Sequence, residues 1–386
     1  MTFVVFKLLE KEKYRMKKIK LCYLISSLCN EGPVNVVYNI IRYIDYSKFD
    51  VSIITFIPEK ENSRLDEFAK FPINIYQLSP QKMIGMKTIY SLLKRKLSEI
   101  NPDELHAHCP RSLYLMPFLP KKYKKIYTIH IYPGEQQIQL YGKWKGKIVI
   151  WLNHLFTKMC DLPIGCAESV GEQYKQNKGW DIMCIPNGAS LPVWNFDQGE
   201  KNALRKEFGL KDGVRYFIFI GRFSKEKNPD VIFEAFRTIQ RKDVGLIMLG
   251  MGNLWEKLKD RCPENIIMPG FTNRVYDYIK ASDYYISASD VEGLANTILE
   301  SMSVGLPMLL SDIPSHREVL HNIKDEHIGY IIDNKNPNDI KDKVNLILSL
   351  DKKRVSDILQ HLYEHKYTAE VMSKKYQQAY IELMNK

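Results

Sequence analysis

The chain has 386 residues, of which 45% are hydrophobic and 26% charged, and its formal net charge is +11. This length exceeds one ordinary hydrophobic core, and the composition excludes disordered and fibrous classes. Seven cysteines without a C-x-x-C pair indicate neither a disulfide framework nor a zinc ribbon. No apolar run reaches the roughly 18–20 residues of a membrane span.

Residues 1–15 are expected to be an extension of the folded chain. Their sequence, MTFVVFKLLEKEKYR, becomes charged too early for a signal peptide. Met16 directly precedes Lys17, Lys18 and the first convincing strand. We therefore expect either that Met16 is the natural start or that residues 1–15 are frayed.

Short β-rich runs alternate with amphipathic helical patterns along the whole chain. Most of these runs are continuously apolar, which indicates strands buried on both faces of a parallel sheet. The alternation predicts an α/β fold with two doubly wound, Rossmann-like sheets. The expected strands are Ile19–Ile25, Val51–Phe56, Ile73–Leu78, Lys125–Ile129, Pro163–Cys166, Ile182–Ile185, Tyr216–Ile220, Gly245–Leu249, Asn265–Met268, Tyr284–Ser287, Pro307–Leu310 and Gly329–Ile332.

A domain boundary is expected in P186-NGASLPVWNFDQGE-K201, where turn formers cluster and the strand–helix rhythm pauses. The first domain then covers residues 1–185 and the second residues 186–365. The segment Tyr363–Lys386 has helical spacing, and residues 366–386 are expected to form a C-terminal helix that packs back on the first domain. Two such domains leave a cleft that receives ligands at the carboxyl ends of the strands.

The first expected strand ends in SSLCNEGPVNVV, where Gly32 and Pro33 form a helix-start signature. Free N–H groups at a helix start form an anion site. Alone this signal is weak, because strand–Gly–helix junctions are common.

A stronger signal lies in Y216-FIFIGRFSKEK-N228. A buried strand ends at Gly221, Arg222 follows directly, and Lys227 lies five residues further on. Two fixed cations at the carboxyl end of a strand suit a diphosphate. A solvated basic loop is the alternative, since other charged residues lie between them. The next strand ends in LGMG at residues 249–252, a second turn where backbones approach closely.

Two carboxylates stand in D290-VEGLANTILESMSVGL-P307. Glu292 follows an expected strand, a helix should begin near Ala295, and Glu300 falls in its second turn. Gly293 and Ala295 leave room for phosphate oxygens at the helix N-terminus. Glu292 can accept hydrogen bonds from sugar hydroxyls and Glu300 from a ribose diol, because carboxylates accept well from diols.

The segments G221-RFSKEK-N228, E292-GLANTIL-E300 and G305-L306-P307 together resemble the retaining glycosyltransferases of family 4 (glycosyl transferases group 1), which have the GT-B fold. The resemblance covers nearly the whole chain. Further similar segments are Gly32 in NEGPVNVV, Thr128-Ile129-His130, Ile185-Pro186-Asn187-Gly188, Ser311-Asp312 and Glu318-Val319.

The resemblance implies a role for each candidate residue. Arg222 and Lys227 would hold the donor pyrophosphate and stabilise the leaving nucleoside diphosphate. Glu300 would bind the ribose, Glu292 the transferred sugar, and His130 would line the sugar site near the acceptor hydroxyl. The remaining donor-binding positions are the loop glycine Gly32, the base loop at Thr272 and Val275, and the helix start at Gly293, Leu294, Ala295 and Asn296.

Two positions depart from the family pattern on the acceptor side. Glu31 stands where the family often has a second glycine, and Cys166-Ala167 replaces its usual serine before Glu168. Neither departure removes a charged catalytic group.

The chain contains no Asp-x-Asp pair, so neither a metal nor another cofactor is expected. Arg222, Lys227 and the helix N-terminus would stabilise the leaving diphosphate instead. The two glutamates are not expected to form the paired carboxylates of a retaining glycosidase. The resemblance implies retention by front-face substitution, with the departing phosphate helping to deprotonate the acceptor. His106 and His108 form an H-x-H pair, for which hydrogen-bonded histidines at a strand end are favoured over a metal site.

The implied function is transfer of a hexosyl or N-acetylhexosaminyl group from a nucleotide-diphosphate sugar, with UDP-sugars favoured over GDP-sugars. The acceptor would be a saccharide or lipid-linked saccharide in the biosynthesis of a cell-surface polysaccharide such as capsule, exopolysaccharide or lipopolysaccharide. A cytoplasmic location, extending to the inner face of the membrane, fits such an acceptor.

The positive charge is concentrated in the first half of the chain. Residues 1–190 contain 28 Lys and Arg against 17 Asp and Glu, whereas residues 191–386 contain 28 of each sign. The run Y141-GKWKGKIVIWLNHLFT-K158 mixes lysines with Trp144 and Trp151, a pattern of segments that lie on anionic membranes. A core helix with solvated lysines is the alternative.

Two rival functions stay open at this point. A nucleotide-sugar epimerase can share the two-sheet architecture, and it would give an epimer from donor alone. A basic nucleic-acid-binding protein is disfavoured, because the basic half shows no recognised binding module. Tight, salt-dependent oligonucleotide binding without nucleotide-sugar binding would favour it.

Overall fold

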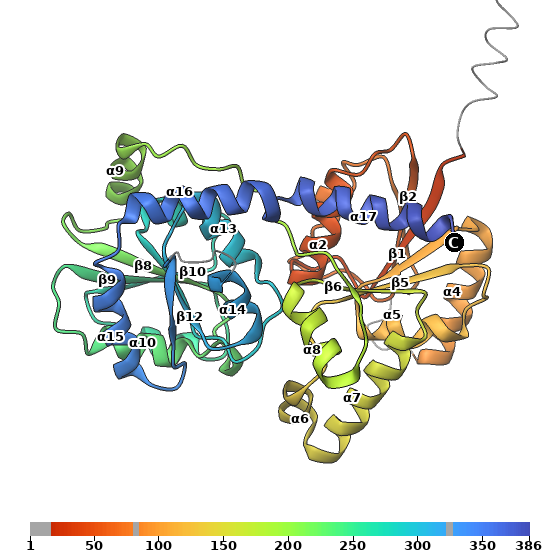
Figure 1. Cartoon of the computed structure of the whole chain (residues 1–386), viewed down its shortest axis with the longest axis horizontal. Coiled ribbons are helices and arrows are strands. Elements are labelled where there is room, and N and C mark those ends of the chain that lie inside the picture. Colours follow the sequence, from red (N-terminus) through yellow and green to blue (C-terminus); the bar gives the residue numbers. More distant parts are fainter. Residues whose placement is uncertain (1–16, 80–84, 322–326) are drawn as a thin grey trace, which may run out of the picture. The chain divides into compact units, whose positions relative to one another are not determined.

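The computed structural model describes residues 17–79, 85–321 and 327–386, so the N-terminal extension lies outside the described residues. These residues form two compact units, each with one β-sheet (Figure 1). The first unit holds the described residues up to 128 together with 133–164 and 373–386, and the second holds 129–132 and 165–372. The domain boundaries drawn from the sequence stay a prediction.

The first sheet has seven strands in the order β3-β2-β1-β4-β5-β6-β7, and its pairs from β3 to β5 are parallel. The expected strands are present, and the sequence pattern missed only β4, whose residues alternate polar and apolar although all are buried. The strands are β1 Ile19–Ile25, β2 Phe49–Thr55, β3 Asn74–Gln77, β4 Glu104–Ala107, β5 Lys124–Ile129, β6 Leu162–Gly165 and β7 Met183–Cys184. The helices among them are α2 Gly32–Arg42, α3 Leu65–Phe68, α4 Met86–Ile100, α5 Pro110–Leu115, η1 Met116–Phe118, α6 Glu135–Tyr141, α7 Lys143–Lys158 and α8 Glu168–Lys178.

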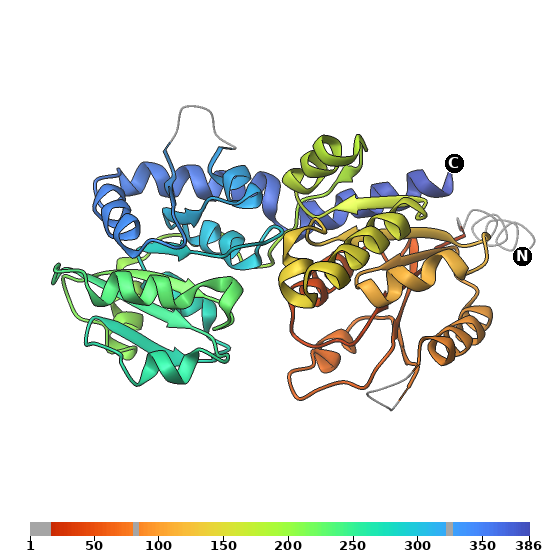
Figure 2. The ribbon, with the colours of Figure 1, turned by 90° about the horizontal axis from the view of Figure 1, so that it is seen from below.

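The second sheet has six strands in the order β10-β9-β8-β11-β12-β13, and every pair is parallel. In each unit helices lie on both sides of the sheet (Figure 2), which is the doubly wound arrangement expected. The strands are β8 Arg215–Ile220, β9 Val244–Leu249, β10 Ile266–Gly270, β11 Tyr284–Ser287, β12 Met308–Ser311 and β13 Gly329–Ile332. The helices are α9 Gln198–Glu207, η2 Lys225–Lys227, α10 Pro229–Arg237, α11 Trp255–Lys259, α12 Val275–Ala281, α13 Asn296–Val304, α14 Pro314–His321, α15 Pro337–Ile347, α16 Lys352–Leu362 and the π-helical turn η3 Tyr363–Tyr367.

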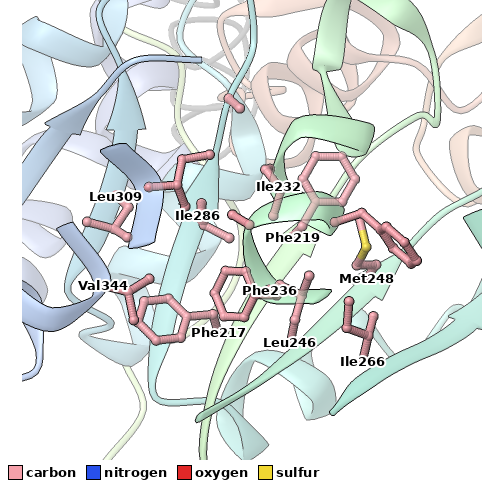
Figure 3. Close-up of a cluster of buried hydrophobic side chains, with 14 of the residues drawn as sticks. Phe217, Phe219, Ile232, Phe236, Leu246, Met248, Ile266, Ile286, Leu309 and Val344 are labelled. Atoms are coloured by element: carbon pink, nitrogen blue, oxygen red, sulfur yellow. The ribbon is translucent and has the colours of Figure 1, made fainter. Parts of the chain in front are cut away.

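The two central strands of the second sheet are held by a continuous apolar core (Figure 3). Phe217 of β8 stacks on Tyr284 of β11 at a ring-centroid distance of 4.7 Å and meets Phe236 of α10 edge-on at 5.2 Å. Full burial of each such side chain stabilises the fold by roughly 1.5–3 kcal/mol. At the amino end of β11 the buried Asp283 carboxylate accepts from Lys201 at 3.0 Å and Lys352 at 2.6 Å. These contacts therefore fix both strands along the part that precedes their carboxyl ends.

The expected C-terminal helix is present as α17, Ala369–Met384, but it does not run on continuously from residue 363, because Thr368 interrupts it. Thr368 is extended, and the passing strand at Ala189 exchanges backbone hydrogen bonds with residues on either side of it. A Cβ atom at Gly188 would clash with the Thr368 carbonyl oxygen, so the two backbones touch. Helix α17, Ala369–Met384, follows, and its residues from 373 onward belong to the first unit.

A buried polar network joins α17 to the first sheet. The Tyr380 hydroxyl lies 3.0 Å from the Tyr23 hydroxyl and 2.8 Å from Nδ1 of His106. Nε2 of His106 lies 2.8 Å from the Thr128 hydroxyl, which in turn lies 3.0 Å from the Tyr376 hydroxyl. Both ring nitrogens of His106 are thus engaged in hydrogen bonds, as the favoured interpretation of the H-x-H pair expected.

Within the described ranges, no helix is long and apolar enough to cross a membrane.

Candidate functional site

The strand order of the second sheet reverses between β8 and β11. In open α/β sheets the loops at the carboxyl ends of two such strands hold the ligand. The loop after β8 carries Arg222 and Lys227, and the loop after β11 carries Glu292. The topology therefore brings together side chains that the sequence places about 65 residues apart.

Lys227 and Glu292 form an ion pair across the two loops, and both side chains are largely buried. The same Oε1 of Glu292 accepts a hydrogen bond from the Ser289 hydroxyl at 2.9 Å. Two partners on one oxygen hold this carboxylate in a fixed orientation. Lys227 and Glu292 thus meet in the structure, whereas their roles toward a donor stay a prediction.

Asn228 holds the two loops together directly. Asn228 adopts a left-handed conformation with φ 46°, which asparagine tolerates better than most residues. Its side-chain amide donates to the Ala288 carbonyl at 2.8 Å and to Asp290 at 2.7 Å. The Asp290 N–H donates in turn to the Glu226 carbonyl at 2.8 Å.

Arg222 is the second cation of this site, and it is open to bind an anionic ligand. Its side chain is exposed, and it makes no hydrogen bond or ion pair with any residue in the described part of the chain. A guanidinium in this position can bind two oxygens of one phosphate group.

The Gly-x-Gly turn after β9 serves the packing of backbones. Gly250 has φ 126°, and a Cβ atom there would clash with the Gly221 carbonyl oxygen. A Cβ atom at Gly252 would lie 2.5 Å from the Phe223 carbonyl oxygen. These glycines therefore allow the turn after β9 to lie directly against the loop that carries Arg222.

Gly293 also allows a close approach, but to the segment that follows β5 rather than to a ligand. Its missing Cβ atom would clash with the His130 carbonyl oxygen and would lie 2.8 Å from Sγ of Cys166. The Cys166 thiol donates to the same His130 carbonyl at 3.2 Å. The expectation that Gly293 leaves room for a ligand needs a correction at its Cβ position, because the backbone of His130 fills that space.

His130 follows β5 and is half-buried. Burial lowers the pKa of its imidazole from 6.5 to about 4, so the ring is neutral at neutral pH. A neutral imidazole beside an acceptor hydroxyl can donate or accept a hydrogen bond but adds no positive charge.

Helix α13 begins where the sequence predicted, with Ala295 as its N-cap. No side chain caps this end, so backbone N–H groups of its first turn are open to an anion. Leu294 just before it is held through its carbonyl, which accepts from the Asn187 side-chain amide at 2.8 Å. The Asn296 side-chain oxygen is buried and has no hydrogen-bond partner within the described residues.

Glu300 lies one turn further along the same helix. Its carboxylate makes no hydrogen bond or ion pair with a described residue, although the side chain is half-buried. Burial raises the pKa of this carboxyl from 4.5 to about 7. An unpaired acceptor at such a position suits a ligand that brings hydroxyl donors.

The base loop after β10 contains Thr272 and Val275, with Val275 opening α12. The Thr272 hydroxyl accepts from the Arg274 N–H at 3.0 Å and so serves the turn itself. Phe271 beside it is 67% exposed, and Met251 of the neighbouring turn is 44% exposed. Sequence reasoning did not single out these two apolar side chains.

Sequence reasoning also missed His316 at the start of α14. Its ring is fully buried, with Nδ1 3.0 Å from the Ser311 hydroxyl and Nε2 without a partner among the described residues. Burial lowers its pKa to about 4, and the nearby Glu292 opposes this shift. The signal that could have pointed to His316 is its position after β12, the strand that lies next to β11 in the sheet.

Gly32 lies in the first unit, at the start of α2. A Cβ atom there would meet nothing within 4 Å, so packing alone does not require glycine at this position. Glu31 is the N-cap and its side chain does not cap the helix. No cluster of three or more potential metal ligands occurs within the described ranges.

Comparison with protein families gives two matches that together span most of the chain. Residues 31–191 match the family described as Glycosyltransferase Family 4, and residues 200–358 match Glycosyl transferases group 1. The division between the two matches falls in the segment that the sequence predicted to join the domains.

Two Escherichia coli proteins are similar along nearly their whole length. The chain is 22% identical over 364 residues to the UDP-Gal:alpha-D-GlcNAc-diphosphoundecaprenol alpha-1,3-galactosyltransferase, covering 89% of this chain and 90% of that protein. It is 24% identical over 383 residues to the O-antigen biosynthesis glycosyltransferase WclY, covering 94% and 98%.

Solved structures establish the same fold. A glycosyltransferase from Rickettsia africae superposes with a TM-score of 0.75 at 16% identity, covering 95% of this chain and 99% of that one. HepE from Anabaena, in complex with UDP and glucose, superposes with a TM-score of 0.76 at 14% identity, covering 94% and 100%.

Proposed function

Since this chain belongs to the family 4 glycosyltransferases (glycosyl transferases group 1) and has the GT-B fold, we propose that it transfers a hexosyl or N-acetylhexosaminyl group from a UDP-sugar. The acceptor is a hydroxyl of a saccharide or lipid-linked saccharide. The names of the two E. coli relatives support this class of acceptor, because one is a galactosyltransferase named for a diphosphoundecaprenol-linked GlcNAc and the other is an O-antigen biosynthesis enzyme. The reaction then belongs to cell-surface polysaccharide synthesis, in the cytoplasm at the inner face of the membrane.

The observation that carries this proposal is the set of groups around the reversal point of the second sheet. Within the described part of the chain, it combines a guanidinium without a partner, an uncapped helix start and a carboxylate without a partner. These three groups match the parts of a nucleotide sugar in turn. Arg222 and the N–H groups of α13 bind the diphosphate, and Glu300 accepts from the ribose hydroxyls.

Glu292 and Lys227 act on the transferred sugar and the phosphate next to it. Donor binding places the Lys227 ammonium against the leaving phosphate while Glu292 accepts from sugar hydroxyls. Because this carboxylate already has a fixed orientation, it loses little freedom when the donor binds. The nucleobase lies over the loop of Thr272 and Val275, where Phe271 offers an exposed ring for stacking.

The transfer follows front-face substitution with retention of configuration. The bond between the anomeric carbon and the phosphate oxygen breaks, and the acceptor oxygen bonds to the anomeric carbon on the same face. The acceptor proton passes to the departing phosphate oxygen. Arg222, Lys227 and the α13 amides hold the negative charge of the leaving diphosphate without a metal ion, and the neutral His130 orients the acceptor hydroxyl.

The test is a thermal-shift screen of the full chain against UDP- and GDP-sugars, followed by product analysis. A matched donor at about 100 times its Kd adds about 2.7 kcal/mol to the free energy of unfolding, and UDP-sugars should give the largest rise in Tm. Incubation with donor and acceptor should yield a glycoside of unchanged anomeric configuration. An epimer from donor alone would replace this proposal, and so would tight oligonucleotide binding without any response to nucleotide sugars.

A further inference from the structure

Helix α7 buries polar side chains and exposes apolar ones, the reverse of an ordinary helix on a water-facing surface. Its buried residues are Gly146, Asn153, His154 and Thr157. The exposed apolar residues, called here the α7 stripe, are Trp144 (80% exposed), Ile148 (58%), Trp151 (61%) and Leu155 (37%). The alternative drawn from the sequence was a core helix with solvated lysines; the lysines are exposed as it expected, but the exposed stripe does not fit a core helix.

The α7 stripe is a single continuous line. Its positions follow the spacing i, i+4, i+7, i+11, which at about 100° per residue keeps all four side chains within about 60° on the helix surface. Leu140 (72% exposed) and Tyr141 (54% exposed), at the end of α6, are exposed as well. Helix α6 packs on the other side of α7, where Gly146 allows the contact because a Cβ atom there would lie 2.5 Å from the Ile138 Cα.

Basic residues surround the α7 stripe and acidic residues are absent from it. Lys143, Lys145 and Lys147 are exposed and make no ion pair with a residue in the described ranges. Residues 142–160 contain no Asp or Glu, and Lys158 adds a further charge at the end of the helix. The partner that covers this surface must therefore be apolar on one side and anionic on the other.

A second copy of the chain does not meet this requirement. A two-fold contact through α7 would place the same lysines opposite one another, and no carboxylate on the stripe could pair with them. Tryptophan beside lysine is instead the combination suited to the boundary between the anionic headgroups and the acyl chains of a bilayer.

We propose that the α7 stripe and the lysines beside it dock the protein on an anionic membrane surface. The stripe side chains enter the acyl boundary, and the three lysines bind lipid phosphates. The helix lies in the plane of the interface and does not span the membrane. This inference does not rest on the proposed sugar transfer, and its test needs no enzymatic activity.

Vesicle cosedimentation of the full chain tests the proposal. The chain should bind vesicles of phosphatidylcholine and phosphatidylglycerol, and bind phosphatidylcholine vesicles much more weakly. The triple variant Lys143→Ser, Lys145→Ser, Lys147→Ser should bind the anionic vesicles about a hundredfold more weakly, because each lysine near an anionic surface contributes a factor of about five. The double variant Trp144→Ser, Trp151→Ser should lose binding at every salt concentration.

Matched controls lie in the second unit. Lys206, Lys242 and Lys257 are exposed lysines without an ion pair to a described residue, and their triple serine variant should bind as the wild type does. Phe196 is 64% exposed, and Phe196→Ser should also leave binding unchanged. An unchanged Tm for the stripe variants shows that they fold.

Three results would overturn the proposal. The first is equal binding to neutral and anionic vesicles, and the second is wild-type binding by the lysine variant or by the tryptophan variant. The third is a lipid-free dimer that the tryptophan variant converts to monomer, together with a wild type that does not bind vesicles. The last result would assign the α7 stripe to a second copy of the chain.

Discussion

Glu292 is held by three groups from three different segments of the second unit. Lys227 and Ser289 bind its carboxylate, and the Ser315 hydroxyl donates to its backbone carbonyl at 3.2 Å. A residue fixed in this way cannot reorient to make up for a lost contact with the sugar. Removal of its charge should therefore lower the rate of transfer more than it lowers the stability of the fold.

Glu292→Gln keeps the shape of the side chain and removes its charge. We expect kcat to fall by about 10²–10³-fold, as when one fixed electrostatic group is removed from an active site. Lys227→Ala should have an effect of similar size. Glu256→Gln, on an exposed position of α11, is the control and should leave turnover unchanged. Near-normal turnover in either site variant, measured with saturating donor, would contradict the assigned roles.

Glu300 should make the stability of the unliganded protein depend on pH. Its folded-state pKa of about 7 lies above the ordinary 4.5, so the folded state binds the proton more tightly than the unfolded state. The stabilisation is complete below 4.5 and is lost as the pH rises through 7. Glu300→Gln should therefore be more stable than the wild type by about 1–3 kcal/mol at about pH 8, with little difference at about pH 4. Denaturant unfolding across this range checks it.

The affinity of the wild type for its donor should depend on pH in the opposite direction. The ribose hydroxyls need an ionised acceptor, so affinity for the UDP-sugar should fall as the pH drops below about 7. Titration calorimetry of Glu300→Gln should show weaker binding and no such slope. The same pH slope in the variant would mean that another group titrates.

At the scale of elements, the loop between β11 and α13 depends on the segment that follows β5. Gly293→Ala forces a methyl group against the His130 carbonyl oxygen and Sγ of Cys166. We expect a loss of about 1–3 kcal/mol in the free energy of unfolding, the usual range for overpacking. Thermal unfolding measures it.

Gly32→Ala is the matched control for stability, since an added methyl group there meets nothing within 4 Å. Its Tm should equal that of the wild type. Equal stability of both variants would show that the backbone at Gly293 moves away without cost.

The position of these loops was predictable from the sequence because charged residues after buried apolar runs mark the carboxyl ends of strands. Arg222, Lys227, Glu292 and the start of α13 were found in this way. The neighbours of Gly293 were not, because a glycine in a sequence does not indicate which distant backbone approaches it. His316 was missed for a similar reason, since its burial depends on the packing of β12 beside β11.

The orientation of α7 also could not be decided from its sequence. A helical period separates a polar face from an apolar one, but it does not say which face turns inward. Only the contacts of Asn153, which accepts from the Tyr114 hydroxyl at 3.0 Å, show that the polar face is buried. The same limit explains the C-terminal break, because Thr368 is extended by its contact with the strand at Ala189.

At the scale of the whole molecule, the proposed donor site and the proposed membrane surface lie in different units. Apart from Gly32, the candidate donor groups lie in the second unit, whereas the α7 stripe and the lysines beside it lie in the first. Substitutions that affect the core of one unit should therefore leave the binding chemistry of the other intact.

Tyr380→Phe tests this independence. The variant loses hydrogen bonds to Tyr23 and His106 inside the first unit, which should cost about 1–3 kcal/mol because their buried partners stay unsatisfied. Its Kd for the UDP-sugar should match that of the wild type. Tyr330→Phe, whose hydroxyl makes no hydrogen bond with a described residue, is the control for both measurements. A weakened Kd in Tyr380→Phe alone would show that the units are coupled.

The return of α17 to the first unit has a consequence for biosynthesis. The ribosome releases residues 165–372, which supply nearly all of the second unit, before it releases Ser373, Tyr376 and Tyr380. The first unit begins to emerge first, yet its hydroxyl network around His106 cannot close until the last residues have left the exit tunnel. The second unit is thus complete while the first unit still lacks its final helix.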